Sequence, residues 1–312
     1  MSNNIIKDPF NYSGNKSKLI PLIKDNLPRD CTILIDLFGG GGCVALSLAD
    51  NFKQVVYNEI NKYIYGIIKT FSIHSKDFCL DRINHNISYY QLNKNNKKGF
   101  LKFREDFNRL GSQILLSDTF NGFTEQTYLD LYTLIVHSFN YFCTIDKSGK
   151  FINTSGAGRC WFNPSLYKKF IEYKNKLDEI YGKKLFIYNE DFRDLYKTIL
   201  NENNNKLNGI LFFVDPVYKI SDDIYRRSAN ILWTEQDEND LYNMLEDINE
   251  LGGKFILTNQ LQKGNVINND LLEFSKRFNT IDTKNSFKNC SYQHKRQNDE
   301  EILVKNYYLK GK

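Results

Sequence analysis

Residues 31–60, CTILIDLFGGGGCVALSLADNFKQVVYNEI, decide the fold of this chain. The opening residues, 31–38, have the composition of a buried β-strand and run directly into four glycines, Gly39 to Gly42. VALSLADNF then suits a helix, and QVVYNEI predicts a second strand. A strand, a glycine turn, a helix and a strand in this order open a doubly wound α/β sheet, so we expect a Rossmann-like fold with helices on both faces.

Three later stretches repeat the pattern of a short apolar strand that ends in polar residues: KKLFIYNEDF, GILFFVDPVY and GKFILTNQ. EEILVKNYYL predicts one more strand near an edge of the sheet. Between about residues 61 and 184 the βα rhythm stops, and a segment this long is more than a structureless loop. We therefore expect a sheet domain of residues 1–60 and 185–312, interrupted by an inserted helical domain of residues 61–184.

Composition limits the class of protein. The 42 basic and 37 acidic residues give a net charge of +5, which permits a basic groove without requiring one. The six cysteines include no C-x-x-C pair, so neither a metal site nor a disulfide framework is expected. The sequence shows no signal peptide and no apolar run of the roughly 20 residues that cross a bilayer. We expect a soluble protein of the cytoplasm, or of a host cell's cytoplasm if a phage or virus encodes it.

The glycine turn predicts a site for a nucleotide-derived ligand. Glycines allow the backbone to approach a ligand closely, and the helix that follows offers free N–H groups. Glu59, at the end of the second strand, can accept hydrogen bonds from both hydroxyls of a ribose. The alternative is a glycine turn that binds nothing. No further glycine follows within the helix, so the turn fits a dinucleotide site poorly. The block from Asp36 to Gly42, Asp-x-Phe-x-Gly-x-Gly with Phe38 at its third position, resembles instead the S-adenosylmethionine motif of methyltransferases.

The tetrapeptide Asp215-Pro216-Val217-Tyr218 leaves the strand GILFFV at the same edge of the sheet. Its alternative reading is ordinary turn chemistry. An aromatic amine is a poor nucleophile because its lone pair is delocalised into the ring. The carboxylate of Asp215 and the carbonyl of Pro216 can accept the two amine hydrogens, and Tyr218 offers a face on which a flipped base can stack. The tetrapeptide therefore predicts capture and activation of a base amine.

In their order along the chain, these motifs resemble those of the Dam-like DNA adenine-N6 methyltransferases. Phe10-Asn11-Tyr12-Ser13-Gly14-Asn15-Lys16 resembles the N-terminal motif, Asn189-Glu190-Asp191-Phe192 the segment that contacts the cofactor's adenine, and residues 215–218 the Asp-Pro-Pro-Tyr catalytic motif. The resemblance implies transfer of a methyl group from S-adenosylmethionine to a flipped adenine, in a catalytic domain interrupted by a DNA-recognition domain. The cofactor-binding residues would be Tyr12, Lys16, Asp36, Phe38, Gly39, Gly41, Glu59, Asp191 and Phe192.

The resemblance also implies double-stranded DNA as partner, with neither a metal nor a membrane, and allows for a cognate restriction endonuclease. Thr144 stands where members that read GATC carry an arginine, and Asn11 where they carry a lysine, so we expect another target sequence. Lys147, Arg159 and Arg226 are further candidate contacts to phosphates or base edges. Histidine-based catalysis is disfavoured because the four histidines show no partner pattern.

Two alternatives remain open at this stage. The same tetrapeptide could act on the N4 amine of cytosine or on an RNA amine, since those amines present similar chemistry. Val217 replaces the second proline of the family's motif, which makes the turn less rigid. The chain could therefore be a DNA-binding relative with impaired catalysis.

Overall fold

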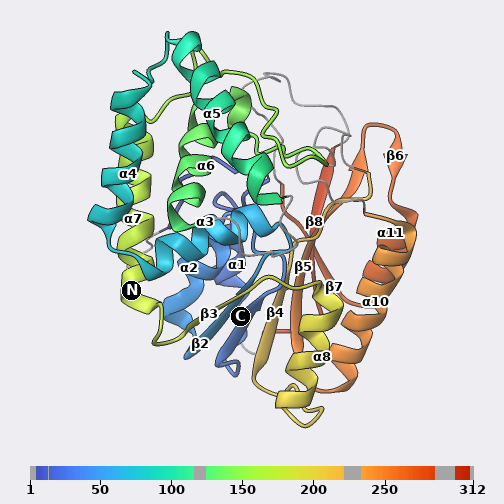
Figure 1. The fold of residues 1–312 in the computed structure, drawn as a ribbon. Coiled ribbons are helices and arrows are strands. Elements are labelled where there is room, and N and C mark those ends of the chain that lie inside the picture. Colours follow the sequence, from blue (N-terminus) through green and yellow to red (C-terminus); the bar gives the residue numbers. More distant parts are fainter. Residues whose placement is uncertain (1–4, 13, 116–123, 221–232, 285–298, 310–312) are drawn as a thin grey trace.

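A mixed β-sheet with the strand order β3-β2-β1-β4-β5-β8-β7 runs through the centre of the computed structural model, and β6 pairs with β5 (Figure 1). The strands are β1 Ile33–Asp36, β2 Gln54–Asn58, β3 Leu185–Tyr188, β4 Ile210–Val214, β5 Lys254–Lys263, β6 Val266–Ile267, β7 Asn279–Asp282 and β8 Glu300–Lys305. The first five of them are parallel, whereas β8 runs antiparallel to both β5 and β7. The structure describes residues 5–12, 14–115, 124–220, 233–284 and 299–309.

Helices cover both faces of this sheet, because its central strands are apolar on both sides. Leu34 of β1 and Phe213 of β4 belong to one hydrophobic core. Their neighbours Ile35 and Phe212 belong to a second core on the opposite face. The second core also contains α8, α10 and α11, which lie on the right of the sheet in Figure 1. These helices are α8 Phe192–Glu202, α10 Glu235–Glu250 and α11 Asn269–Ser275.

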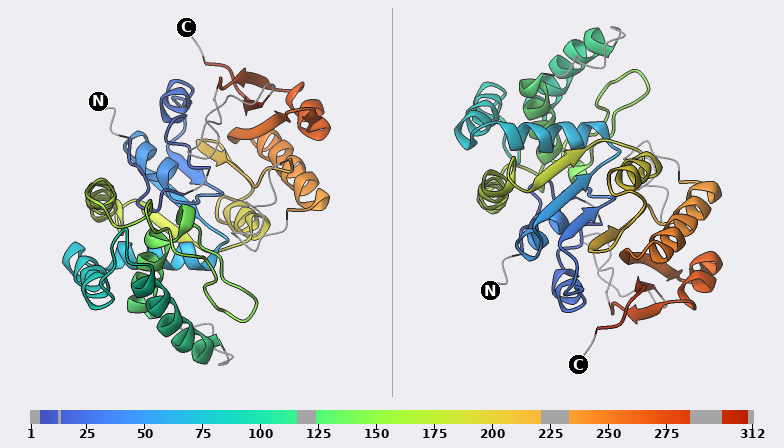
Figure 2. Two further views of the ribbon diagram at one scale, coloured as in Figure 1. Left: turned by 90° about the horizontal axis from the view of Figure 1, so that it is seen from above. Right: turned by 90° about the horizontal axis from the view of Figure 1, so that it is seen from below.

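The larger core joins the other sheet face to the remaining helices. These are α1 Ile20–Asp25, α2 Cys43–Leu48, α3 Lys62–Ile73, α4 Lys76–Tyr89, α5 Lys97–Leu115, α6 Glu125–His137 and α7 Pro164–Ile180, with the 3-10 turns η1 Ala49–Asn51 and η2 Phe139–Tyr141. Both views in Figure 2 place α4 and α5 on the opposite side of the molecule from α10 and α11. The stretch 61–184 is thus helical, as expected, and α3 and α7 within it share a core with the sheet. The boundary of a separate recognition domain stays a prediction.

The strands expected from the sequence are present, and so is the α/β class. The last predicted strand is β8, which lies next to the edge strand rather than on the edge itself. β7 was missed because its four residues, NTID, alternate between half-buried and exposed positions and carry little hydrophobic signal. α1 was missed as well, since six residues are too few to establish a helical period.

Candidate active site

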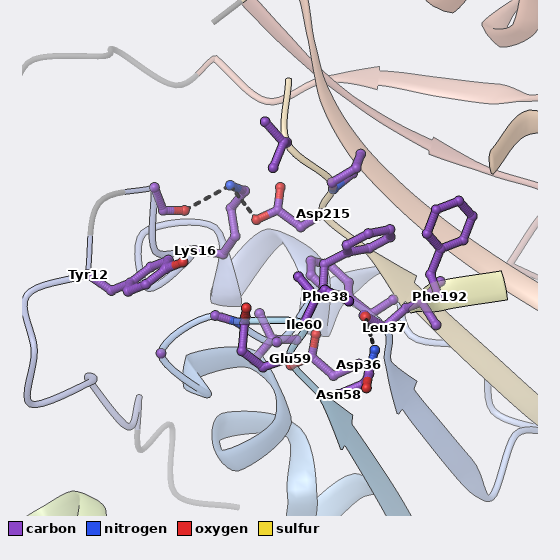
Figure 3. Close-up of a pocket in the computed structure, with 18 of the residues that line it drawn as sticks. Tyr12, Lys16, Asp36, Leu37, Phe38, Asn58, Glu59, Ile60, Phe192 and Asp215 are labelled. Atoms are coloured by element: carbon purple, nitrogen blue, oxygen red, sulfur yellow. Dashed lines mark hydrogen bonds and ion pairs between the residues drawn. The ribbon is translucent and has the colours of Figure 1, made fainter. Parts of the chain in front are cut away.

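The loops that follow β1, β2 and β4 enclose a cavity of about 230 Å³, together with the N-terminal segment and the start of α8 (Figure 3). This edge is where the carboxyl ends of parallel strands meet, the usual ligand site of open α/β sheets. The cavity brings together residues that lie far apart in the sequence. Twelve predicted site residues line it: Tyr12, Lys16, Asp36, Phe38, Gly39, Gly41, Glu59, Asp191, Phe192, Asp215, Pro216 and Tyr218.

The glycine loop fits its place only because it lacks side chains. A Cβ at Gly39 would lie 2.2 Å from the ring of Tyr57, and one at Gly41 would lie 2.8 Å from the Cβ of Asp8. Gly40 adopts a positive φ of 51°, which glycine tolerates without strain. The hydroxyl of Tyr57 donates to the carbonyl oxygen of Gly40 at 2.6 Å. The loop is therefore held against the sheet and leaves its open side to the cavity.

Two buried carboxyl groups border this loop. Asp36 accepts a hydrogen bond from the backbone N–H of Ala45 at 3.0 Å and so anchors the first turn of α2. Burial raises the pKa of Asp36 to about 8, and the neighbouring charges of Asp215 and Glu59 act in the same direction. Burial also raises the pKa of Glu59 to about 7, against the opposing effect of two backbone N–H donors. A cavity that holds this many acids favours a ligand with hydroxyl, amine or positively charged groups.

Glu59 is held in one orientation by the backbone. Its two oxygens accept hydrogen bonds from Gly40 N and Asn61 N, both at 2.7 Å. Each carboxylate oxygen keeps a further lone pair, so Glu59 can still accept from two hydroxyls. Its neighbour Asn58 donates to the carbonyl oxygens of Leu37 and Glu190, at 3.1 and 3.0 Å, and thereby ties three cavity loops together. This role of Asn58 was not predicted, because an asparagine at the end of a strand is a common turn residue.

Aromatic rings form another wall of the cavity. The ring of Phe192 lies 5.5 Å from that of Phe38 and 5.9 Å from that of Trp233, measured between centroids. Asp191 caps α8 by accepting from the backbone N–H of Arg193 at 2.9 Å. Trp233 is buried in the core and also lines the cavity. Flat rings beside fixed carboxylates suit a purine base and its ribose.

Asp215 lies at the end of β4, where it faces the cavity with 16% of its side chain exposed. The ammonium of Lys16 lies 2.7 Å from its Oδ2, and the hydroxyl of Thr258 donates to its Oδ1 at 2.9 Å. Burial raises the pKa of Asp215, and so does the charge of Glu301, whereas Lys16 lowers it. Thr258 and Glu301 were not predicted. A glutamate beside the apolar run ILV in a short strand was the one signal of Glu301 in the sequence.

Tyr218 contacts this cluster through its hydroxyl. The hydroxyl oxygen lies 2.7 Å from Glu301 Oε1 and 3.1 Å from Asp215 Oδ1. Lys16 lies over the ring, with its Nζ 5.2 Å from the centroid. The side chain of Val217 is half-buried and packs against the core that contains α8 and α10. Asp215, Pro216 and Tyr218 are thus brought together at the cavity, and Val217 lines it beside them.

The four predicted DNA contacts within the described residues, Asn11, Thr144, Lys147 and Arg159, lie outside the lining of the cavity. Asn11 accepts a hydrogen bond from Lys169 of α7. Thr144 and Asn153 bond to each other across a loop: Asn153 Oδ1 accepts from Thr144 N at 2.6 Å, and Asn153 Nδ2 donates to Thr144 Oγ1 at 3.2 Å. Three further candidates remain: Lys147 and Arg159 are exposed, and Arg226 lies outside the described residues.

No helix in the ranges that the structure describes is long and apolar enough to cross a membrane. Within those same ranges, no group of three or more His, Cys, Asp or Glu side chains is arranged to hold a metal ion.

Sequence comparison identifies known proteins that resemble this chain over nearly its whole length. The chain is 29% identical to the type II methyltransferase M.FokI of Planomicrobium okeanokoites, and the match covers 98% of this chain and 44% of the relative. It is 26% identical to the modification methylase StsI of Streptococcus sanguinis, over 98% of this chain and 43% of that protein. The modification methylase LlaI of Lactococcus lactis subsp. lactis is 25% identical, and the match covers 96% of this chain and 43% of that protein. The chain thus spans less than half the length of these relatives.

The family comparison covers nearly the whole chain. Residues 12–307 match the model of the D12 class N6 adenine-specific DNA methyltransferases. This range begins at the aromatic residue of the N-terminal motif, Tyr12, contains the glycine loop and residues 215–218, and ends just beyond β8. With the sheet order and the cavity described above, the match shows that the chain belongs to the D12 class N6 adenine-specific DNA methyltransferase family.

Proposed function

We propose that this chain transfers a methyl group from S-adenosylmethionine to the exocyclic N6 amine of adenine in double-stranded DNA. The observation that carries the proposal is the position of Asp215. Its carboxylate faces a cavity that also contains a glycine loop, the fixed acid Glu59 and the aromatic pair Phe38 and Phe192. A nucleoside-binding wall and an amine acceptor thus share one enclosed space.

The residues present fit S-adenosylmethionine. Gly39 and Gly41 let the loop lie against Tyr57 and Asp8 and turn its backbone to the cavity, Glu59 keeps lone pairs for ribose hydroxyls, and Phe38 and Phe192 offer faces to a purine. Asp191 would accept from the amine of that purine, while Tyr12 and Lys16 would border the rest of the ligand. Acidic side chains around the cavity also suit a positively charged sulfonium. When bound, the cofactor supplies an electrophilic methyl group.

The chain's own residues prepare the amine. In the proposal, Asp215 and the carbonyl of Pro216 accept its two hydrogens, which draws the nitrogen towards tetrahedral geometry and restores its lone pair. The carboxylate also stabilises the positive charge that develops on this nitrogen. Because Asp215 is mostly buried, an adenine inside a duplex cannot reach it, and the proposal includes flipping of the target base. Tyr218 offers its ring as the stacking surface.

The target sequence is proposed to differ from GATC. Support comes from Thr144, whose hydroxyl is bonded to Asn153, and from Asn11, which bonds Lys169 instead of supplying a cation of its own. With DNA as substrate, the proposal places the enzyme in the cytoplasm. The names of the relatives associate them with modification of DNA, and a cognate endonuclease is proposed on that ground.

The test is methylation of genomic DNA by the purified chain with labelled S-adenosylmethionine, followed by digestion to nucleosides. N6-methyladenine is the expected product. N4-methylcytosine, or labelling of RNA alone, would replace the proposal with the corresponding amine methyltransferase. Asp215→Ala should abolish incorporation, with cofactor affinity retained in calorimetry. Cofactor and DNA binding without turnover in the unaltered chain would indicate a binding protein.

A further inference from the structure

Glu301 is a buried carboxylate next to the proposed catalytic cluster, on the strand β8. It is 2% exposed. Its Oε1 lies 2.7 Å from the hydroxyl oxygen of Tyr218 and 3.8 Å from the ammonium of Lys16. Burial of a carboxylate in a sheet costs free energy unless partners stabilise the charge. Neither the amine chemistry nor the cofactor fit gives Glu301 a role.

The backbone and a second side chain hold Glu301 in place. β8 lies between β5 and β7, and Glu301 pairs with Gln260 in the β5 register. The hydroxyl of Thr283 donates to Glu301 Oε2 at 3.3 Å, and Thr283 N donates to the backbone oxygen of Glu301 at 3.0 Å. Because its backbone and its Oε2 are both held, the Glu301 carboxylate can fix the position of the Tyr218 hydroxyl that it contacts through Oε1.

Tyr218 has one hydroxyl hydrogen and two carboxylate neighbours. A phenol donates a single hydrogen bond, so it cannot donate to Glu301 and Asp215 at the same time. The oxygen–oxygen distance to Glu301, 2.7 Å, is the usual length of an O–H···O bond, whereas that to Asp215 is 3.1 Å. Tyr218 therefore donates its hydroxyl hydrogen to Glu301. Thr258 remains the hydroxyl that donates to Asp215 Oδ1.

We propose that Glu301 is a positioning residue: by accepting the Tyr218 hydrogen, it keeps that hydroxyl from donating to Asp215. Asp215 Oδ1, which already accepts from Thr258, then keeps its second lone pair for the target amine. The inference rests on the proposed function. An Asp215 oxygen that already received the phenol hydrogen would be a weaker acceptor for the amine. The same bond holds the ring of Tyr218 at the cavity wall. Glu301 itself touches neither substrate nor cofactor.

A double-mutant cycle between Glu301→Gln and Tyr218→Phe tests this directly. Glu301→Gln removes the charge, so that the Tyr218 hydrogen can turn to Asp215, and kcat should fall about tenfold. Tyr218→Phe removes the anchor of the ring and should lower kcat about threefold. The double variant should be no slower than Tyr218→Phe, since no hydroxyl is left to compete for Asp215. Losses that multiply would overturn the proposal, as would full activity of Glu301→Gln.

A structural readout needs no turnover. In a crystal structure of Glu301→Gln, the Tyr218 hydroxyl should lie closer to Asp215 Oδ1 than the 3.1 Å seen here. An unmoved hydroxyl would contradict the inference. If Glu301→Gln cannot be purified folded, Glu301→Asp takes its place in the same cycle. Its carboxylate keeps the charge but is withdrawn by one methylene from the Tyr218 hydroxyl, so the same direction of change is expected.

Controls separate positioning from stability and from the proposed function. Tyr307→Phe removes a buried hydrogen bond of 2.6 Å, to the carbonyl of Asn26, just beyond β8 and away from the cavity. It should lower the unfolding temperature and leave kcat unchanged. If the unaltered chain methylates no nucleic acid, the proposed function fails; if it is active and the cycle is additive, the role of Glu301 alone fails. Cofactor affinity should stay within about twofold in Glu301→Gln, since Glu301 lies outside the cavity lining.

Discussion

The Nζ of Lys16 lies 2.7 Å from Oδ2 of Asp215, so the residue proposed to receive the target amine is paired with a buried ammonium (Figure 3). Lys16 comes from the N-terminal segment before α1, and Asp215 from the end of β4. The ammonium also donates to the carbonyl oxygen of Gly14 at 2.9 Å. A positive charge at this distance stabilises the ionised carboxylate, which is the form that can accept hydrogens from an amine.

Replacing that ammonium should change the pH dependence of the reaction. Burial and the charge of Glu301 raise the pKa of Asp215, and Lys16 lowers it, so Lys16→Met should raise this pKa further. Since Asp215 must be ionised, the acid limb of a plot of kcat/KM against pH should move to higher pH. Tyr218 and Thr258 also face Asp215 and are unchanged in this variant. Lys16→Arg keeps the positive charge and should leave the acid limb at the same pH. Identical plots of kcat/KM against pH for Lys16→Met and the unaltered chain would contradict the expectation.

Val217→Pro tests whether the departure from the family's tetrapeptide matters. The two proposed acceptors belong to Asp215 and Pro216, and the side chain of Val217, which lines the cavity and packs against the core of α8 and α10, supplies neither of them. We therefore expect kcat to change by less than about threefold, the size of a modest change in backbone stiffness. Steady-state methylation assays at saturating cofactor measure it. A large gain in activity would show that valine impairs the natural sequence.

The buried acids of the cavity should make the ligand-free protein less stable as pH rises. The pKa values of Glu59 and Asp36 are raised to about 7 and about 8, above the usual values of 4.5 and 3.8. Between the usual and the raised value the folded chain binds more protons than the unfolded chain, so the free energy of unfolding falls as pH increases. The unfolding temperature should drop between about pH 6 and pH 8, and less so in Asp36→Asn. An unfolding temperature that rises between pH 6 and pH 8, or that drops equally in Asp36→Asn, would contradict this link between the raised pKa values and stability.

Arg159→Ala should weaken DNA binding through the loss of one phosphate contact. Arg159 is exposed on the loop that precedes α7, and that loop is held to α5 by Asn108, which bonds the backbone of Phe151 at 2.8 and 3.1 Å. The slope of log affinity against log salt should decrease in magnitude by about one. Fluorescence anisotropy over a salt series measures it. Arg277→Ala removes an exposed arginine between α11 and β7 and is the matched control; equal effects of both would exclude a specific role for Arg159.

Much of the fold followed from local sequence. The apolar runs ILID and ILFFV, each ended by an aspartate, predicted strands whose polar ends meet at one edge of a sheet. The glycines after Asp36 predicted a turn open to a ligand, and the break in βα rhythm predicted a helical stretch after β2. These features are local because each depends on the side-chain periodicity or the backbone freedom of a few adjacent residues. β7 was not predicted because its four residues are too few to show the two-residue alternation of a strand.

What the sequence determined by itself is the set of chemical groups: Asp36, Glu59 and Asp215 at strand ends, with the aromatics beside them. What only the tertiary structure decided is which of these groups touch. The register of β8 against β5 places Glu301 beside Tyr218, and the path of the N-terminal segment places Lys16 against Asp215. Such pairs join residues far apart along the chain, and packing of the whole sheet fixes their separation. The charges and hydrogen bonds that tune the site therefore belong to the fold, not to any motif.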